Sequence, residues 1–407
     1  MNRKLLPSLI ALLTVGAAGV VNAADSVPVP TVYGKVNVTL NKYEFDDLSS
    51  SKVKINGQDN WQLESNASRL GVKGDIPLAE SLKAVYKLEY EVFTDGSSSN
   101  AFTQRNTYAG LQGSSWGTII AGKNDTPLKA TTAETLQQFK DLPLGDFKYV
   151  MVGENRENNI IQYSTPNFSG FVFSAMLMPG EDSGELTDTA GNKIKNQNNG
   201  IADRFSVGAT YKLDKLYLAL ADDQNVQNTD TLRFAAQYGI GPVTFGGVYQ
   251  NAKRHDKDVL VSTTTSRANL TTGVITTTTA NTTGTDNGKL GSLSSLPTPN
   301  NASSVGNPIN DFGNYDSQDA YAVEAAWKID KNWTLKGQYV ESKSSPITSG
   351  LSDTTAKNYA LGVDYNFTPA SKVFAYYASI KTDGDLTATT SETLDDKTYA
   401  VGYELKF

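Results

Sequence analysis

The chain ends in the stretch KTYAVGYELKF, residues 397–407, in which large apolar side chains occupy every second position from Tyr399 onward. Strict alternation is typical of a β-strand with one apolar face, because successive side chains of a strand point to opposite sides. The same pattern recurs along the chain, with polar or charged residues at the alternate positions. We therefore predict an all-β protein, a transmembrane antiparallel β-barrel with an apolar outer face and a wet interior.

The first 23 residues have the features of a secretory signal peptide. Two basic residues, Arg3 and Lys4, precede a short apolar run over residues 9–21, and small residues up to Ala23 form a cleavage pattern. A membrane anchor is the alternative, and it fits less well because the run is short and the cleavage pattern follows directly. We expect export, cleavage near Ala23, and one barrel domain over residues 24–407.

The composition argues against several kinds of site and partner. With 36 basic and 43 acidic residues the formal net charge is −7, which suggests no nucleic-acid partner. The chain has no cysteine, so it can form neither a disulfide nor a thiolate metal site. One histidine, His255, cannot build a histidine-rich metal site. We predict no metal and no cofactor. Beyond the first 23 residues, no run approaches the roughly 18 apolar residues of a spanning helix.

Short turns and longer polar connections alternate between the predicted strands. The short turns are rich in Gly, Pro, Asp, Asn and Ser and lie at residues 75–81, 113–116, 165–170, 213–215, 239–242, 330–332 and 368–371. The longer connections lie at residues 44–60, 94–102, 124–157, 178–202, 223–229, 251–318, 341–355 and 382–396. Together they join sixteen strands, and the even number places both chain ends on the short-turn side.

Four basic residues have the phase of the barrel interior. Lys35 alternates with the apolar residues of the first strand, Arg69 with those of the next, and Arg105 and Arg156 are likewise out of phase with apolar neighbours. An arginine that faced lipid near the bilayer midplane would cost roughly 2–4 kcal/mol. We therefore expect all four to point into the lumen.

The connection at residues 251–318 is long, rich in Thr, Ser, Asn and Gly, and almost without periodicity. We expect an exposed external loop, because unstructured segments of this length are uncommon inside compact domains. A contact site for a phage or a host surface is the functional alternative, in which the barrel would act as an adhesin or receptor.

Several short stretches together resemble the Gram-negative general diffusion porins, which are trimeric sixteen-stranded channels of the bacterial outer membrane. The stretches are Val32–Lys35, Ser68–Gly74, Arg105–Leu111, Gly117–Gly122 and Val401–Phe407. Each is weak alone, but their order, their spacing and the terminal Phe407 make the resemblance specific to the family. It implies passive diffusion of small hydrophilic solutes and ions, a homotrimer, and contact with outer-membrane lipid, with Val36, Val38 and Leu40 facing lipid or a partner.

The resemblance also implies that the third long loop, residues 124–157, folds into the lumen and constricts it. Its motif pattern places a basic cluster on the wall and acidic residues on the loop. The residues of the loop themselves favour a short helix at Thr131–Lys140, with Glu134 and Gln137 one turn apart. Leu144 follows Pro143 where the pattern has a glutamate, so this acidic contributor is either missing or replaced. The implied constriction residues are Lys35, Arg69, Arg105 and Arg156 on the wall, and Asp141, Asp146 and Glu154 on the loop.

Other functions remain as alternatives. A substrate-specific channel would show an aromatic track along the lumen, and no inward aromatic ladder is evident. Gly113–Gly117 matches the Gly-x-Ser-x-Gly nucleophile pattern around Ser115, but a tight turn between strands is the wrong context, and we predict no enzyme. The lumen charges could also simply pair with one another and keep the lumen solvated. The negative net charge favours cation preference.

Overall fold

The structure is a computed structural model, and its described residues include the strands of the barrel wall and part of the long connections between them. They are residues 28–46, 61–96, 98, 100, 102–133, 136–180, 186–187, 193–194, 200–255, 260–268, 275–283, 315–347 and 349–407. The predicted signal peptide, residues 1–23, and much of the predicted loop 251–318 lie outside them.

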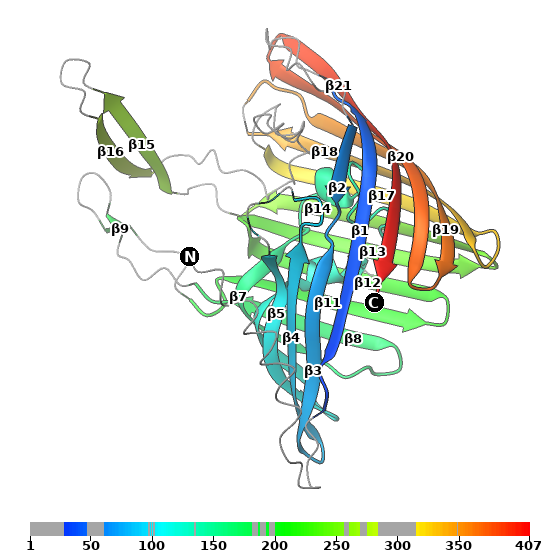
Figure 1. Cartoon of the computed structure of the whole chain (residues 1–407). Helices are drawn as coiled ribbons and strands as arrows, with labels where there is room; N and C mark the ends of the chain where they lie inside the picture. The colour runs from blue at the N-terminus through cyan, green and yellow to red at the C-terminus, as the bar shows by residue number, and fades with distance from the viewer. Residues whose placement is uncertain are drawn as a thin grey trace.

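Sixteen antiparallel strands form a closed barrel (Figure 1), as predicted. Their bounds are β1 (Thr31–Glu44), β2 (Trp61–Ser65) with β3 (Arg69–Ala79), β4 (Leu82–Val92), β5 (Phe102–Gly113), β6 (Gly117–Asp125), β7 (Arg156–Ser164), β8 (Phe171–Met178), β11 (Arg204–Leu213), β12 (Leu216–Val226), β13 (Thr229–Ile240), β14 (Val243–Arg254), β17 (Tyr315–Lys328), β18 (Trp333–Pro346), β19 (Thr354–Thr368), β20 (Ser371–Thr387) and β21 (Thr390–Lys406). Segments β2 and β3 form one wall strand, because both pair with β1. The break between them includes Ala67, whose φ is 48°.

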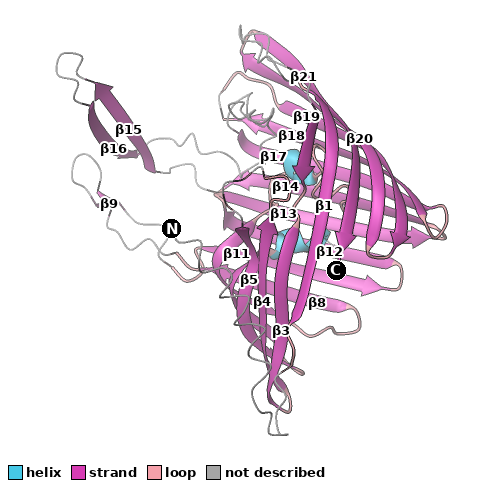
Figure 2. Ribbon diagram, in the orientation of Figure 1, coloured by secondary structure: helices cyan, strands magenta, loops and turns pink. Residues whose placement is uncertain are grey.

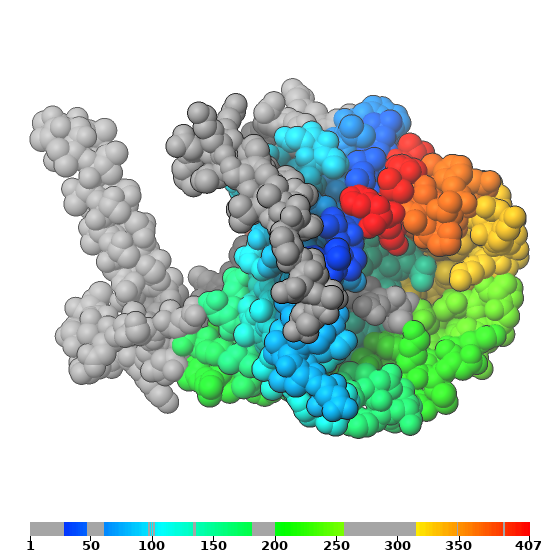
Figure 3. All heavy atoms as spheres, turned by 60° about the horizontal axis from the view of Figure 1, so that its bottom comes forward, coloured from blue at the N-terminus to red at the C-terminus, as the bar shows by residue number. Residues whose placement is uncertain are grey.

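The first and last strands close the barrel. Strand β1 pairs with β21 from Lys35↔Lys406 to Glu44↔Lys397. The backbone of the C-terminal Phe407 also exchanges hydrogen bonds of 2.9 and 3.1 Å with Gly34. In Figure 3 the colours run around the wall until blue and red meet, which shows this closure from one end of the barrel. Two separate hairpins, β9 (Leu186–Thr187) with β10 (Lys193–Ile194) and β15 (Leu260–Ala268) with β16 (Ile275–Thr283), lie within the long connections.

All seven predicted short turns lie between paired strands, but two of the predicted long connections are wrong. Between β12 and β13 only Gln227 and Asn228 remain, both with positive φ as in a two-residue hairpin turn. Between β20 and β21 only residues 388–389 remain, because pairing continues to Thr387↔Thr390. The outer parts of these strands carry polar residues on both faces, so hydrophobic alternation does not reveal them.

The two faces of the wall follow the predicted phases. Outward positions are exposed and apolar, as at Tyr321, Val323 and Trp327 of β17. Inward positions such as Lys35 and Arg105 are enclosed within the barrel, with 6% and 8% exposure.

The connection between β6 and β7 folds into the barrel, as Figure 2 shows for its two short helical segments. These are α2 (Pro127–Ala133) and the 3-10 turn η1 (Phe147–Tyr149). The helix expected at Thr131–Lys140 is therefore wrong in position. Pro127 suits the first helical turn, whereas Gln137 has a φ of 74°, which an α-helix cannot accommodate. Glu134 lies outside the described residues, and no helix among the described residues is long and apolar enough to cross a membrane.

The largest apolar cluster lies inside the barrel, between this loop and one half of the wall. The loop contributes large side chains, namely Leu136, Phe139, Leu142, Leu144, Phe147, Tyr149, Val150 and Met151. The facing wall contributes many small ones, namely Ala219, Ala235, Ala320, Ala322, Ala356, Ala360, Ala378 and Ala400. Small wall residues leave room for the loop, which therefore packs against strands β12 to β21. The open part of the lumen lies on the other side of the loop.

Candidate functional site

A cavity of about 760 Å³ lies between the inner loop and the strands from β2 to β7. Its lining includes charged side chains of both signs from the wall and from the loop. Among them are Arg69, Glu89, Glu91, Arg105, Asp125, Asp141, Asp146, Glu154 and Arg156. Six of the seven predicted constriction residues thus line one space, and the seventh, Lys35, contacts Asp141 from β1.

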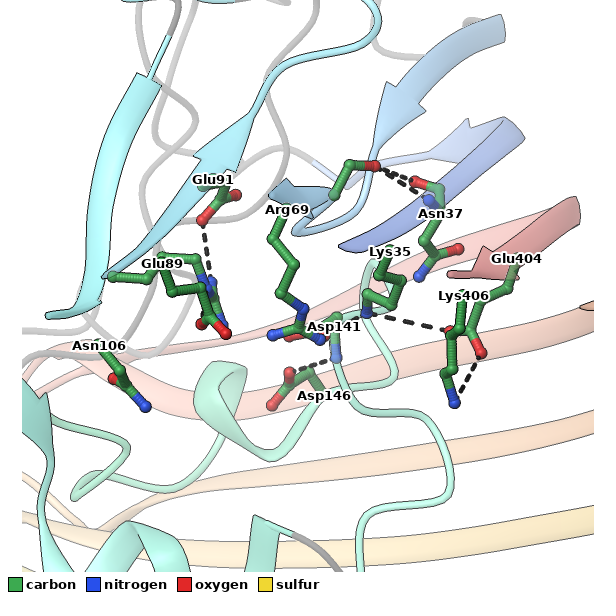
Figure 4. A network of polar contacts seen from close by, with 12 residues as sticks. Lys35, Asn37, Arg69, Glu89, Glu91, Asn106, Asp141, Asp146, Glu404 and Lys406 are labelled. Carbon is green, nitrogen blue, oxygen red and sulfur yellow. Dashed lines mark hydrogen bonds and ion pairs between the residues drawn. The ribbon is translucent and has the colours of Figure 1, made fainter. Parts of the chain in front are cut away.

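Asp141 on the loop bridges two basic residues of the wall. Its Oδ2 lies 2.7 Å from Lys35 Nζ and 3.3 Å from Arg69 Nη2, as Figure 4 shows. Lys35 and Arg69 are direct register partners on β1 and β3, so both side chains point inward at one level. Burial would raise the pKa of Asp141, but the two cations outweigh burial and hold its pKa well below the usual range. Asp141 therefore carries its negative charge throughout the neutral range.

Arg105 pairs with acidic residues of the wall rather than with the loop. Its Nε lies 3.0 Å from Glu89 Oε1 and its Nη1 lies 3.0 Å from Glu91 Oε2. Both carboxylates come from the adjacent strand β4, and Glu89 also accepts a hydrogen bond of 2.8 Å from the Tyr33 hydroxyl. Sequence reasoning placed the acidic side of the site on the loop and missed these two wall carboxylates. Their inward phase in β4 was the available signal.

Arg156 joins the end of the loop to its beginning. Its Nη2 lies 2.9 Å from Asp125 Oδ1, and its Nε donates a hydrogen bond of 2.5 Å to Asn106 Oδ1. Lys129, on α2, lies 3.2 Å from the same Asp125 oxygen. This group fixes α2 beside β5 and β7, at the edge of the cavity.

Asp146 shapes the loop from within. Its carboxylate accepts backbone hydrogen bonds from Asp141, at 2.7 Å, and from Lys148, at 3.0 Å, and it caps the 3-10 turn η1. Burial raises the pKa of Asp146, although Lys148 opposes the shift. Leu144 is fully buried in the apolar cluster, so the position where the family pattern has a glutamate serves packing here.

Glu154 is held by an arginine that sequence reasoning missed. Arg233 of β13 has no exposed surface, and its Nη1 lies 2.7 Å from Glu154 Oε1. The same guanidinium donates to Gln250 Oε1 at 2.8 Å, to Thr132 Oγ1 at 3.0 Å and to the Val152 carbonyl at 3.1 Å. Burial would raise the pKa of Glu154, but Arg233 and Lys129 keep it below its ordinary value. Arg233 alternates with the exposed Leu232 and Phe234, and this inward phase could have identified it from the sequence.

Further polar wall residues hold the backbone of the loop. Glu324 Oε2 accepts hydrogen bonds from the backbone amides of Gln137, at 2.9 Å, and Gln138, at 3.0 Å. Gln338 donates to the Gly145 carbonyl at 2.7 Å, and the Tyr376 hydroxyl donates to the Pro143 carbonyl at 3.1 Å. Because strands far apart in the sequence hold it, the loop has one defined position in the lumen.

Ser115 has the predicted context of a tight turn between two strands. This residue lies in the turn between β5 and β6, not in a strand-to-helix turn. His255 lies at the opposite, loop end of the barrel, with its Nδ1 2.6 Å from Asp230 Oδ1. Within the described ranges, no group of three or more His, Cys, Asp and Glu residues could hold a metal ion.

Comparison with known proteins points to one family. A family model described as Gram-negative porin matches residues 8–385. The major outer membrane protein P.IB of Neisseria gonorrhoeae is 29% identical over 204 residues, which are 49% of this chain and 56% of that protein. Outer membrane porin protein 32 of Delftia acidovorans is 30% identical over 173 residues, which are 40% of this chain and 47% of that protein. The chain spans about half the length of these curated relatives.

A solved structure supports the fold. An anion-selective porin from Comamonas acidovorans matches with a TM-score of 0.61 and 18% identity, over 93% of this chain and 99% of that one. At this identity the likeness concerns the arrangement of the strands alone.

Proposed function

Because this chain belongs to the Gram-negative porin family, we propose that it forms a water-filled channel for passive diffusion of small hydrophilic solutes and ions. The main support is the cavity between the inner loop and the first strands, with its charged lining of both signs. A small polar solute loses part of its hydration in a narrow passage, and fixed donors and acceptors can replace it. Apolar solutes gain nothing from such a lining.

The proposed constriction consists of Lys35, Arg69, Arg105 and Arg156 on the wall and Asp141 on the loop. Asp141 bridges Lys35 and Arg69. Arg105 and Arg156 instead form ion pairs with carboxylates of the wall strands. Asp146 and Glu154 contribute by holding the loop in shape, through backbone hydrogen bonds and the pair with Arg233. Charged groups that pair with one another can still replace part of the hydration of a solute, because the paired groups present polar atoms to the cavity.

We propose the bacterial outer membrane as the location, after removal of residues 1–23, and a homotrimer as the assembly. The relatives are named as outer membrane proteins, which favours this location, and the exposed apolar residues of the outer wall suit lipid contact. In the trimer, the outward side chains of Val36, Val38 and Leu40 on β1 would face a partner or lipid. We propose no chemical reaction, since Ser115 lies in a turn unsuited to a nucleophile.

Solute flux into vesicles tests the proposal. Proteoliposomes swell when a channel admits an external sugar, so wild-type protein should give swelling rates that fall steadily as the sugar grows and do not saturate with concentration. A tryptophan in place of Ala130, which is exposed on α2 and lines the cavity, should slow large sugars more than small ones. The matched control is Ala325→Trp, on the outward face of β17, which should swell like the wild type.

Two outcomes would favour another function. Saturable uptake of one sugar would indicate a substrate-specific channel. Absence of swelling from barrels shown to be folded would argue against a diffusion channel altogether.

A further inference from the structure

Lys148 is a half-buried cation of the inner loop, and its side chain lines the cavity. It belongs to η1, and its neighbours Phe147 and Tyr149 are both buried in the apolar cluster between the loop and the wall. Its backbone amide donates a hydrogen bond of 3.0 Å to the Asp146 carboxylate, which caps the turn. The backbone that carries Lys148 is therefore fixed on both sides, and the side chain extends into the lumen.

Lys148 forms no ion pair among the described residues, in contrast to several other cations of the cavity. Its Nζ lies 5.0 Å from the centroid of the Tyr149 ring and interacts with that side chain. The other cations each have a carboxylate oxygen between 2.9 and 3.3 Å away, namely Arg69, Lys87, Arg105, Lys129 and Arg156. The ammonium group of Lys148 therefore acts on the charges of the cavity across space rather than within one fixed pair.

Carboxylates from both sides of the cavity interact electrostatically with Lys148. Asp141 and Asp146 belong to the loop, whereas Glu64 and Glu91 belong to the wall strands β2 and β4. Figure 4 shows Glu91 on its strand and the two aspartates on the loop. A loop cation thus faces wall carboxylates here, which is the reverse of the arrangement in which the Asp141 carboxylate faces wall cations.

Neutral donors hold two of these carboxylates. Asp146 is buried and accepts its hydrogen bonds from backbone amides, and it forms no ion pair within the part of the chain that the structure describes. Glu64 accepts hydrogen bonds from the Tyr43 hydroxyl, at 2.8 Å, and from Asn41 Nδ2, at 3.2 Å. Neutral donors satisfy the oxygen atoms of a carboxylate but leave its negative charge, so the free energy of both groups falls when a cation is near. Lys148 supplies that cation from the loop.

We propose that Lys148 is a specificity-determining residue of the channel, because its ammonium group takes the position between loop and wall that a cationic solute would otherwise occupy. A tethered group competes at a high effective concentration, so an ammonium group of a solute displaces it poorly. Cationic solutes therefore do not collect beside Glu64, Glu91 and Asp146. This inference deepens the proposed channel function and rests on it, but the occupancy of the position can also be measured without ion flow.

Ion selectivity tests the role of Lys148 in the open channel. In Lys148→Ala the ratio of potassium to chloride permeability, taken from the reversal potential in a KCl gradient, should rise by about threefold, as for the loss of one charge in a water-filled cavity. Lys148→Arg keeps the charge and should restore the wild-type ratio. The matched control is Lys331→Ala, which removes the same charge at an exposed position in the short turn between β17 and β18. An unchanged ratio in Lys148→Ala, or an equal change in the control, would overturn the proposal.

Addition of the missing group tests the position itself. Lys148→Ala removes the equivalent of n-propylammonium, so this ion should lower the potassium current of the variant, with half of the effect at about 10 mM, and return the permeability ratio toward the wild-type value. The wild type should need at least about tenfold more, because its own ammonium group competes. The neutral n-propanol has nearly the same shape and should affect neither protein. Equal sensitivity of both proteins to n-propylammonium would contradict the proposed position of Lys148.

Thermal stability provides a readout that needs no channel activity. In neutral detergent, n-propylammonium chloride should raise the melting temperature of Lys148→Ala more than that of the wild type, whereas KCl at the same concentration should affect both equally. Lys148→Gln is the second variant, for use if Lys148→Ala folds poorly. Equal shifts with n-propylammonium would overturn the proposal. A folded barrel that does not conduct would refute the proposed function but leave this comparison of melting temperatures valid, so the two failures are distinguishable.

Discussion

Arg233 and Glu154 form an ion pair of 2.7 Å inside the barrel, and the arginine has no exposed surface. Glu154 lies at the end of the inner loop, two residues before β7 begins, whereas Arg233 belongs to β13, which β8, β11 and β12 separate from β7 along the wall. The same guanidinium also binds the Val152 carbonyl and the Thr132 hydroxyl, so one wall residue contacts both arms of the loop. The position of the loop, and with it the width of the cavity, depends on this contact.

Loss of Arg233 should destabilise the barrel strongly. In Arg233→Gln the carboxylate of Glu154 stays buried without its partner, which costs about 3–5 kcal/mol. The free energy of unfolding, measured by urea titration in lipid vesicles, should fall by that amount, and the open-channel current should become noisier. The control is the double variant Arg233→Gln with Glu154→Gln, which should lose clearly less than the sum of the single variants. Additive losses would show that the two residues act independently.

Asp141 should set part of the ion selectivity. In Asp141→Asn the cations of Lys35 and Arg69 lose the carboxylate that bridges them, so the lumen becomes more positive. The reversal potential in a KCl gradient should shift toward chloride relative to the wild type. Glu80→Gln makes the same change of charge at an exposed position in the short turn between β3 and β4, and it should leave the reversal potential unchanged. Equal shifts for both variants would contradict a role for Asp141 in the passage. For the wild type, cation preference stays a prediction from the net charge alone.

The contribution of Asp141 to stability should depend on pH in one direction. Burial acts to raise its pKa, yet Lys35 and Arg69 hold the pKa below that of an unfolded aspartate, about 3.9. The folded state therefore binds this proton less readily, and the stabilisation is fully present above about pH 5 and is lost as the pH falls below about 4. The difference in free energy of unfolding between wild type and Asp141→Asn should be constant from pH 5 to 8 and shrink below pH 4. A difference that grows on acidification would mean that the cations do not stabilise this carboxylate.

Gly246 of β14 should tolerate no side chain. A Cβ there would collide with Leu136 of the loop and lie 2.9 Å from Glu324 Oε1, the carboxylate that holds the loop backbone through the amides of Gln137 and Gln138. Gly246→Ala should therefore displace the loop and cost about 1–3 kcal/mol of stability. Thermal unfolding and conductance should both change. The adjacent Gly247→Ala is the control, because its Cβ would meet only the Ala322 carbonyl at 3.6 Å. Similar effects of both substitutions would contradict the tight fit of the loop at Gly246.

The barrel could be predicted from the sequence because its main signal is local. Alternation in stretches such as residues 399–407 and the short turns rich in Gly, Pro and Asn gave the strands, their number and the faces of Lys35 and Arg69. The ends of β20 and β21 were not predictable in this way, because both faces of a strand are polar beyond the membrane.

The contacts of the inner loop were predictable only in part. The family pattern identified the loop and Asp141, but a contact such as Arg233 with Glu154 joins residues 79 positions apart. It depends on how the loop packs against small wall residues, and no local pattern encodes that packing. The position of α2 was missed because residues 131–140 favour a helix by their composition, whereas Pro127 marks the actual beginning of the helix.

Single-channel recording in a planar bilayer tests the central claim most directly. Wild-type protein extracted in detergent should produce stepwise increases of current in KCl, with closures in groups of three if the assembly is a trimer. The variant Arg69→Ser with Arg105→Ser should insert equally well and show a different conductance or reversal potential, because both arginines line the cavity. A folded barrel that inserts into the bilayer and gives no current steps would contradict the account.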